Sequence, residues 1–145
     1  MALLVVLGGG ESGVGTAILA LKKGYDVFVS DKGKIKEKYK NVLEHFEIDW
    51  EEEQHSEDRI LKADLVMKSP GIPDKVPLVK QLVEKGVPVI SEIEFASKYT
   101  DAKIIGITGS NGKTTTTMLT NHILASAELK VGMAGNIGDS YAKMV

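Results

Sequence analysis

The sequence predicts an α/β protein built on a parallel sheet, with a first complete domain followed by the start of a second. Short, continuously apolar stretches alternate with amphipathic stretches along the 145 residues. This alternation is typical of parallel strands that are buried on both faces by helices. Glycine-rich turns follow two of the apolar stretches, at 8–13 and 109–112, and each leads into a helical pattern. Such turns between a strand and a helix favour a nucleotide-binding fold.

The elements of the first domain are predicted from apolar runs and from the residues that end them. Strands are expected at 2–7, 26–30, 63–68 and 87–90. Gly24 and Gly86 are expected to end two helices, because glycine readily adopts the left-handed conformation of a helix C-cap. The predicted helices cover 14–23, 56–61, 77–85 and 92–99, and 40–54 fits a helix followed by a weak strand.

The domain boundary is predicted so that 1–95 form the first domain and 96–145 form the front of the second. In the second part, strands are expected at 103–107 and 130–134, on either side of a helix at 113–127. Because two strands are too few to make an independently stable sheet, the chain is expected to be the front part of a longer protein.

Composition is typical of an ordinary globular protein from a reducing compartment. Hydrophobic residues make up 43% of the chain and charged residues 26%, and the formal net charge is −2. This charge argues against general nucleic-acid binding. The chain has no cysteine, which excludes disulfides and cysteine metal sites. No apolar run approaches the ~20 residues that cross a bilayer, so no membrane partner and a cytoplasmic location are expected.

The strongest chemical signal lies at 106–117, which reads Gly-Ile-Thr-Gly-Ser-Asn-Gly-Lys-Thr-Thr-Thr-Thr. Backbone N–H groups in such a turn, and at the start of the helix that follows, bind phosphates. Lys113 would supply positive charge to the terminal phosphates, and the Thr114 hydroxyl would ligate Mg²⁺. Ile107 stands where the generic phosphate-loop pattern has glycine, so this loop is a compact variant. The phosphate-binding residues are expected to be Gly109, Ser110, Asn111, Gly112, Lys113, Thr114 and Thr115.

A second glycine-rich turn, at 8–13, satisfies the pattern Gly-x-Gly-x-x-Gly between the first strand and the first helix. Asp31 follows at the end of the second strand, from which a ribose or a base is contacted in Rossmann-like domains. Backbone can approach a diphosphate closely at such a turn. A dinucleotide is the usual ligand, and tight strand-to-helix packing without a ligand is the alternative.

A third turn, Ser69-Pro70-Gly71-Ile72-Pro73, follows the strand at 63–68. Open α/β sheets bind ligands at the carboxyl ends of their strands, where this turn falls. Its prolines stiffen the backbone and Gly71 allows a ligand to approach closely. An ordinary rigid turn remains the alternative.

No functional site is expected at two other groups of polar residues. Glu51, Glu52 and Glu53 are expected to be solvated surface. The histidines have no shared metal-ligand spacing; they are His45, His55 and His122.

The order of the motifs resembles the front part of the Mur ligases of peptidoglycan synthesis. These motifs are the glycine turn at 8–13, Ser-Pro-Gly-Ile at 69–72, the phosphate loop, and Gly-Asn-Ile-Gly at 135–138. The resemblance covers nearly all of the chain. Asn111 and Asn136 favour the branch that adds D-glutamate, since the L-alanine-adding branch typically has histidine where Asn111 stands.

The resemblance implies that the first domain binds the uridine diphosphate part of a nucleotide sugar rather than NAD. Glu11 and Ser12 would lie at the diphosphate and uridine, and Asp31 with Lys32 would face the uracil. The pair Lys32-Gly33 departs from the commoner polar pair of the family. The implied UDP-sugar residues are Glu11, Ser12, Asp31, Lys32, Ser69, Pro70, Gly71 and Asn136.

The resemblance also implies an ATP-dependent amide ligase of cell-wall synthesis that uses Mg²⁺. A carboxylate of UDP-N-acetylmuramoyl-L-alanine would attack the γ-phosphate of ATP, and the amine of D-glutamate would then displace phosphate from the acyl phosphate. Lys113 and Asn136 would be the catalytic residues, and Thr114 the metal ligand. The adenine and D-glutamate sites would lie beyond Val145, so these 145 residues are expected to bind the UDP-sugar without catalysing ligation.

Three other functions fit part of the sequence. A sibling ligase that adds L-alanine, or a folate- or cyanophycin-type ligase, would share the phosphate loop. A non-catalytic NAD- or nucleotide-sensing module built on 8–13 leaves the loop at 109–115 unexplained. A phosphate-loop ATPase regulator leaves Asp31 and the Ser-Pro-Gly turn unexplained.

Overall fold

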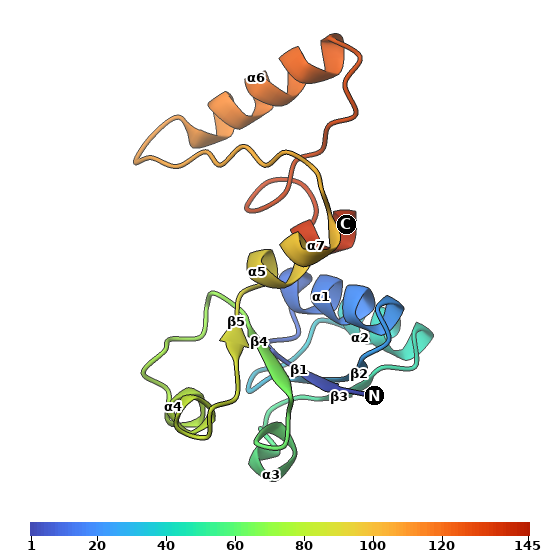
Figure 1. The fold of residues 1–145 in the computed structure, drawn as a ribbon, viewed down its shortest axis with the longest axis vertical. Helices are drawn as coiled ribbons and strands as arrows, with labels where there is room; N and C mark the ends of the chain where they lie inside the picture. The colour runs from blue at the N-terminus through green and yellow to red at the C-terminus, as the bar shows by residue number, and fades with distance from the viewer.

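The computed structural model describes residues 1–145 as two lobes (Figure 1). One lobe holds a parallel sheet and its helices, and the other is dominated by the helix α6 (Lys113–Ser126). The strands are β1 (Leu3–Leu7), β2 (Asp26–Ser30), β3 (Asp49–Glu51), β4 (Leu65–Lys68) and β5 (Val89–Ile90). The other helices are α1 (Glu11–Lys22), α2 (Glu37–His45), α3 (Glu57–Ile60), α4 (Pro77–Glu84), α5 (Glu92–Ala96), the 3₁₀ turn η1 (Ser97–Tyr99) and α7 (Tyr141–Met144).

The five strands form one sheet in the order β3-β2-β1-β4-β5, and every neighbouring pair is parallel. This confirms the predicted α/β class. The chain builds outward from β1 in one direction through β2 and β3, and in the other through β4 and β5. The carboxyl end of β1 is therefore the switch point at which open parallel sheets bind ligands.

The central strand β1 is buried on both faces, and its side chains divide between two cores. Leu4 and Val6 belong to a core shared with α1 and α2, whereas Val5 and Leu7 belong to a core shared with α3 and α4. Successive strand residues point to opposite faces, so a continuously apolar strand requires helices on both sides. The apolar run at 2–7 therefore encodes the three-layer arrangement.

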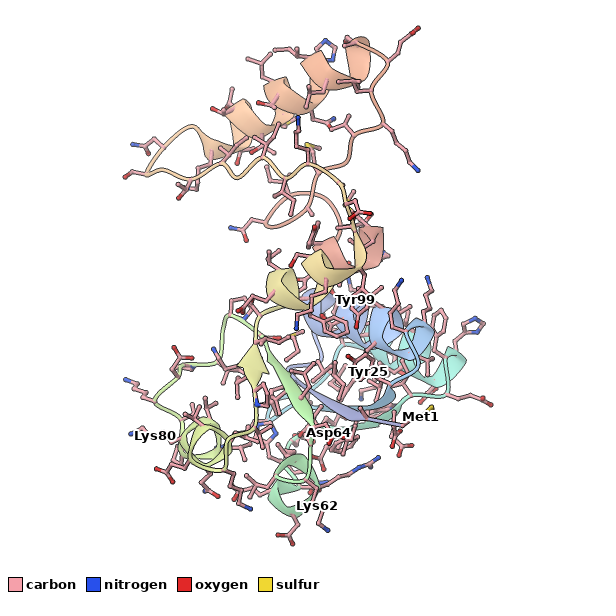
Figure 2. All side chains as sticks on the ribbon, viewed as in Figure 1. Met1, Tyr25, Lys62, Asp64, Lys80 and Tyr99 are labelled. Carbon is pink, nitrogen blue, oxygen red and sulfur yellow. The ribbon has the colours of Figure 1, made fainter.

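Three aromatic residues join α5 and η1 to the start of β2. Phe95 is fully buried, and its ring lies edge-on to the rings of Tyr25 and Tyr99, with centroids 5.8 and 5.2 Å away. Figure 2 shows Tyr25 and Tyr99 close together, and the Tyr99 hydroxyl donates to that of Tyr25 at 3.3 Å. Burial and this hydrogen bond raise the pKa of Tyr99 to about 12. These contacts hold η1 against the start of β2, and after Tyr99 the chain leaves the sheet lobe toward α6.

The strands predicted at 103–107 and 130–134 are wrong: neither segment forms a strand, and the nearest pairing is an isolated bridge between Ala134 and Asp139. Both segments line one shallow pocket with α6, so they lie side by side without a hydrogen-bonded ladder. Ile104 and Ile105 are 58% and 59% exposed. An apolar run forms a strand only where a neighbouring strand supplies its hydrogen bonds. The run itself does not show whether such a neighbour exists.

We expect this difference to be visible in amide hydrogen exchange. Amide hydrogens that are not bonded between strands exchange through small local openings, whereas those of β1 and β4 exchange only when the whole sheet opens. Amides at 103–107 and 130–134 should therefore exchange at least ~100-fold faster than those of β1 and β4. Exchange followed by mass spectrometry would measure this, and uniform protection of both lobes would contradict it.

Candidate functional site

The glycine turn at 8–13 lies where three strands end. Gly8 has a φ of +105°, its N–H donates to the Ser30 carbonyl at 2.9 Å, and the Ser69 N–H donates to the Leu7 carbonyl at 3.0 Å. A Cβ atom on Gly8 would lie 2.5 Å from the Ser69 Oγ. The Ser-Pro-Gly turn therefore lies against the glycine turn, as the prediction for Ser69 requires, with Pro70 and Gly71 exposed beside it.

The close approach of helix α1 to the turn depends on Gly13. A Cβ atom there would lie 1.8 Å from the Gly8 carbonyl oxygen. The helix begins at Glu11 rather than at the predicted Val14, with Gly10 as its N-cap. The glycines of this first turn are poor helix formers, which is why propensity placed the start too late. The N-terminus of α1 is thereby brought to the turn, where its free N–H groups favour an anion.

Asp31 joins the glycine turn to the loop after β2. Its Oδ2 accepts a hydrogen bond from the Gly9 N–H at 2.6 Å, and its Oδ1 accepts one from the Gly33 N–H at 2.8 Å. Lys32 is exposed and makes no hydrogen bond through its side chain. Asp31 is therefore held in a fixed position at the edge where a nucleoside would lie, and its carboxylate also shapes the turn itself.

Glu11 and Ser12 occupy the first turn of α1. The Glu11 Oε2 accepts from the Tyr39 hydroxyl at 2.8 Å, and its Oε1 lies 3.9 Å from the Lys143 Nζ. Ser12 is half-buried, and its carbonyl accepts from the Thr16 hydroxyl at 2.9 Å. Lys143 comes from the far end of the chain, so residues from both ends meet at the predicted diphosphate position.

A buried polar network lies behind Asp31, and the prediction that Glu51 is solvated surface is wrong. Glu51 is 9% exposed, and it accepts hydrogen bonds from the Ser30 hydroxyl at 2.6 Å and from the Ser56 N–H and hydroxyl at 2.7 and 2.6 Å. The His55 Nδ1 lies 2.6 Å from the same Ser30 oxygen. A run of three glutamates is typical of an exposed surface, so the sequence predicted exposure for all three. The fold, however, places Ser30 beside one of them, Glu51.

The donors in this network fix the tautomer of His55. Burial raises the pKa of Glu51, but the hydrogen bonds from Ser30 and Ser56 outweigh it, so the net pKa lies below its ordinary value. An ionised Glu51 can only accept, so the Ser30 hydroxyl donates to it and the His55 Nδ1–H donates to Ser30. Burial lowers the pKa of His55, which leaves a neutral ring whose Nε2 is an acceptor.

This network predicts how stability depends on pH. A histidine with a lowered folded-state pKa stabilises the fold above its ordinary value of 6.5, and a carboxyl with a lowered pKa does so above its ordinary value of 4.5. Both contributions are lost as the pH falls through the folded-state values. We expect the Tm to fall between pH 7 and pH 4, and the fall above pH 5 to be shallower in His55→Asn. Superimposable Tm profiles of the two proteins would contradict this role.

The phosphate loop forms one exposed turn at the start of α6. Gly109 has a φ of +148°, and Gly112, with a φ of +76°, is the N-cap of the helix. The Lys113 Nζ donates to the Gly109 carbonyl, and the Thr114 hydroxyl makes no hydrogen bond. The structure therefore gathers the predicted residues from Gly109 to Thr115 in one loop, with the lysine folded over it.

The phosphate loop and the glycine turn lie in different lobes (Figure 1). Asn136 is exposed on the turn at 135–138, which lies next to the bridge between Ala134 and Asp139. The structure thus does not bring Asn136, Lys113 and the first-lobe residues together in one cleft. The sequence order predicted each turn, but it contained no information on the distance between them.

A hollow of about 660 Å³ lies between α4, β5 and α5. Lys68 and Pro70 line it on one side and Glu92 on another, while none of the residues 8–13 does. The glycine turn therefore lies outside this hollow. No cluster of His, Cys, Asp or Glu in the structure could hold a metal ion, and no helix is long and apolar enough to cross a membrane.

A parallel sheet with a glycine turn at its switch point, followed by a second glycine-rich turn at the start of a separate helix, defines an α/β protein of the nucleotide-binding class with two candidate phosphate-binding turns. The family models agree with this class: residues 4–76 match the MurD N-terminal domain and residues 107–144 match the Mur ligase middle domain. The chain belongs to the Mur ligase family, and its sheet lobe is a MurD-type N-terminal domain.

The curated relatives share most of the sequence of this chain. It is 66% identical over 142 residues to the UDP-N-acetylmuramoylalanine–D-glutamate ligase of Christiangramia forsetii, and 57% identical to that of Porphyromonas gingivalis (strain W83). Each match covers 98% of this chain and 32% of the relative, so the chain spans about a third of the length of these relatives.

Solved structures of related ligases share the fold. The UDP-N-acetylmuramate:L-alanyl-γ-D-glutamyl-meso-diaminopimelate ligase of Neisseria meningitides matches with a TM-score of 0.64 and 25% identity, over 97% of this chain and 46% of that one. A pseudomurein peptide ligase type C from Methanothermus fervidus matches with a TM-score of 0.60 and 31% identity, over 94% of this chain and 29% of that one.

Proposed function

We propose that this chain supplies the UDP-sugar site and the ATP phosphate loop of a ligase that adds D-glutamate to UDP-N-acetylmuramoyl-L-alanine in peptidoglycan synthesis. The observation that carries the proposal is the MurD-type lobe, in which Asp31 and Ser69 close the glycine turn, followed by a Lys-Thr phosphate loop. The 66% identical relative carries the name of this activity. We place the domain boundary at residues 95 and 96.

In the first lobe, the diphosphate would lie on the turn at 8–13 and the N-terminus of α1. The helix dipole and the free N–H groups there favour a doubly charged anion. Glu11 and Ser12 would lie at the diphosphate and the uridine, and the ion pair between Glu11 and Lys143 is long and exposed, so it contributes little there. Asp31 and Lys32 would face the base, and the turn at 69–71 would close the nucleoside pocket.

In the second lobe, Gly109 to Thr115 would hold the phosphates of ATP. Lys113 lies over the loop through its hydrogen bond to Gly109, and its charge would neutralise the γ-phosphoryl group during transfer. When bound, Mg²⁺ would neutralise the charge of the phosphates, and the Thr114 hydroxyl, which makes no hydrogen bond within the chain, would be its protein ligand. Asn136 would contact the substrate near the carboxylate that attacks the phosphate.

The proposed chemistry has two steps. The L-alanyl carboxylate attacks the γ-phosphorus of ATP, which gives an acyl phosphate and ADP. The amine of D-glutamate then attacks the acyl carbon, and an amide forms as inorganic phosphate leaves. Positioning and charge neutralisation account for most of the catalysis in phosphoryl transfer, which agrees with a site that depends on a lysine, an asparagine and backbone N–H groups.

Titration calorimetry tests the proposal. UDP-N-acetylmuramoyl-L-alanine should bind the chain, Asp31→Ala should weaken that binding at least ~10-fold, and NADH should give no heat. Binding of NADH with no response to the UDP-sugar would refute the proposal. We also expect no D-glutamate-dependent ADP release from these 145 residues alone, and release above background would refute this part.

A further inference from the structure

The end of the chain returns to the first lobe after the turn at 135–138. Figure 1 shows α7 beside α1 and α5, and contacts join it to both helices. Ser140, the N-cap of α7, and Ala142 are each 3% exposed. A Cβ atom on Gly15 of α1 would lie 2.0 Å from the Ser140 Oγ. Helix α7 is therefore seated in a notch that the missing side chain of Gly15 leaves in α1.

Glu92 makes the polar connection in this interface. It is the first residue of α5, is 8% exposed, and its Oε1 accepts a hydrogen bond from the Ala142 N–H at 2.9 Å. A carboxylate is costly to bury unless it is hydrogen-bonded, and the N–H groups at the start of a helix otherwise lack partners. Ser91 and Glu94 form a capping box that fixes the start of α5, so the Glu92 backbone is itself anchored.

What α7 holds is the turn that carries Asn136. The turn ends at Gly138, and Asp139 is the single residue between it and the buried Ser140. The second polar connection, between Lys143 and Glu11, is 3.9 Å long, and its side chains are 53% and 41% exposed. Exposed ion pairs contribute little. The buried hydrogen bond of Glu92 and the notch at Gly15 therefore set the position of the turn relative to the nucleotide lobe.

We propose that Glu92 is a positioning residue: by anchoring α7 to the nucleotide lobe it fixes the turn that carries Asn136, and so determines affinity for the sugar-peptide part of the substrate. This inference rests on the proposed function. The uridine nucleotide would be held by the turn at 8–13, by Asp31 and by the turn at 69–71, and the only side-chain hydrogen bond of Glu92 is the one to Ala142. The loss of Glu92 should therefore separate binding of the UDP-sugar from binding of UDP.

The experiment compares UDP and UDP-N-acetylmuramoyl-L-alanine by titration calorimetry on the wild-type chain and on Glu92→Ala. We expect Glu92→Ala to lower affinity for the UDP-sugar about tenfold, the loss of one buried hydrogen bond, and to leave affinity for UDP within about twofold. Glu92→Gln should restore affinity for the UDP-sugar, because its amide oxygen can still accept from the Ala142 N–H.

Gly15→Ala provides an independent test from the opposite side of the interface. The three heavy atoms nearest to the added Cβ belong to Ser140 and Lys143, so the change should displace α7 and leave the glycine turn intact. It should show the same selective loss as Glu92→Ala. An equal loss for UDP and the UDP-sugar in both variants, or no loss in either, would overturn the inference. If the wild-type chain binds neither UDP nor the UDP-sugar, the proposed function itself would be refuted.

Discussion

Replacing Gly13 with alanine is expected to abolish binding of the uridine nucleotide and to lower the free energy of unfolding by about 3 kcal/mol. The added Cβ would lie 1.8 Å from the Gly8 carbonyl oxygen and 3.0 Å from its carbon. Both are backbone atoms, so no side-chain rotation relieves the clash. Helix α1 must move away from the turn, and its N–H groups then no longer point at the diphosphate position.

Gly10→Ala is the matched control in the same turn. Gly10 has an ordinary φ of −86°, and nothing lies within 4 Å of a Cβ placed there. Chemical denaturation and UDP titration of the two variants would separate the effect of the steric clash at Gly13 from the general effect of replacing a glycine in this turn. Wild-type affinity in Gly13→Ala, or an equal loss in Gly10→Ala, would contradict this account of the turn.

The sequence predicted the sheet lobe well because its signals are local. A continuously apolar strand such as 3–7 must be buried on both faces, and a glycine turn directly after it can only lead into a closely packed helix. These two facts predict the parallel sheet, the switch point and the positions of Asp31 and Ser69. The local pattern was also sufficient for the turn at 109–112 and for a helix that begins at Lys113, since the glycines lie within a few residues of Lys113.

The features that were missed depend on residues distant in sequence. Glu51 is buried because Ser30, on the neighbouring strand, donates to it at 2.6 Å. Glu92 is buried because α7 returns from fifty residues further along to contact it. The apolar segment at 103–107 forms no strand because no neighbour pairs with it. In each case the missing information was the identity of the partner, which residue pattern alone does not supply.

Replacing Lys113 with alanine is expected to lower affinity for MgATP at least ~30-fold, because charge-assisted contacts to phosphate are about twice as strong as neutral ones. Lys113 is the only cation in the loop from Gly109 to Thr115, and its Nζ already donates to the Gly109 carbonyl. The variant therefore loses the phosphate contact and also a hydrogen bond that holds the loop in shape. Titration with MgATP and with magnesium pyrophosphate would measure both effects.

Lys130→Ala is the matched control, because Lys130 is exposed in the same lobe but lies after α6, outside the loop. Its removal changes the net charge by the same amount, so a long-range charge effect would weaken MgATP binding equally in both variants. A direct role requires a large loss in Lys113→Ala alone, for pyrophosphate as well as ATP. Equal behaviour of the two variants would show that the loop does not bind phosphate through Lys113, whereas a loss confined to ATP would place the lysine near another part of the nucleotide.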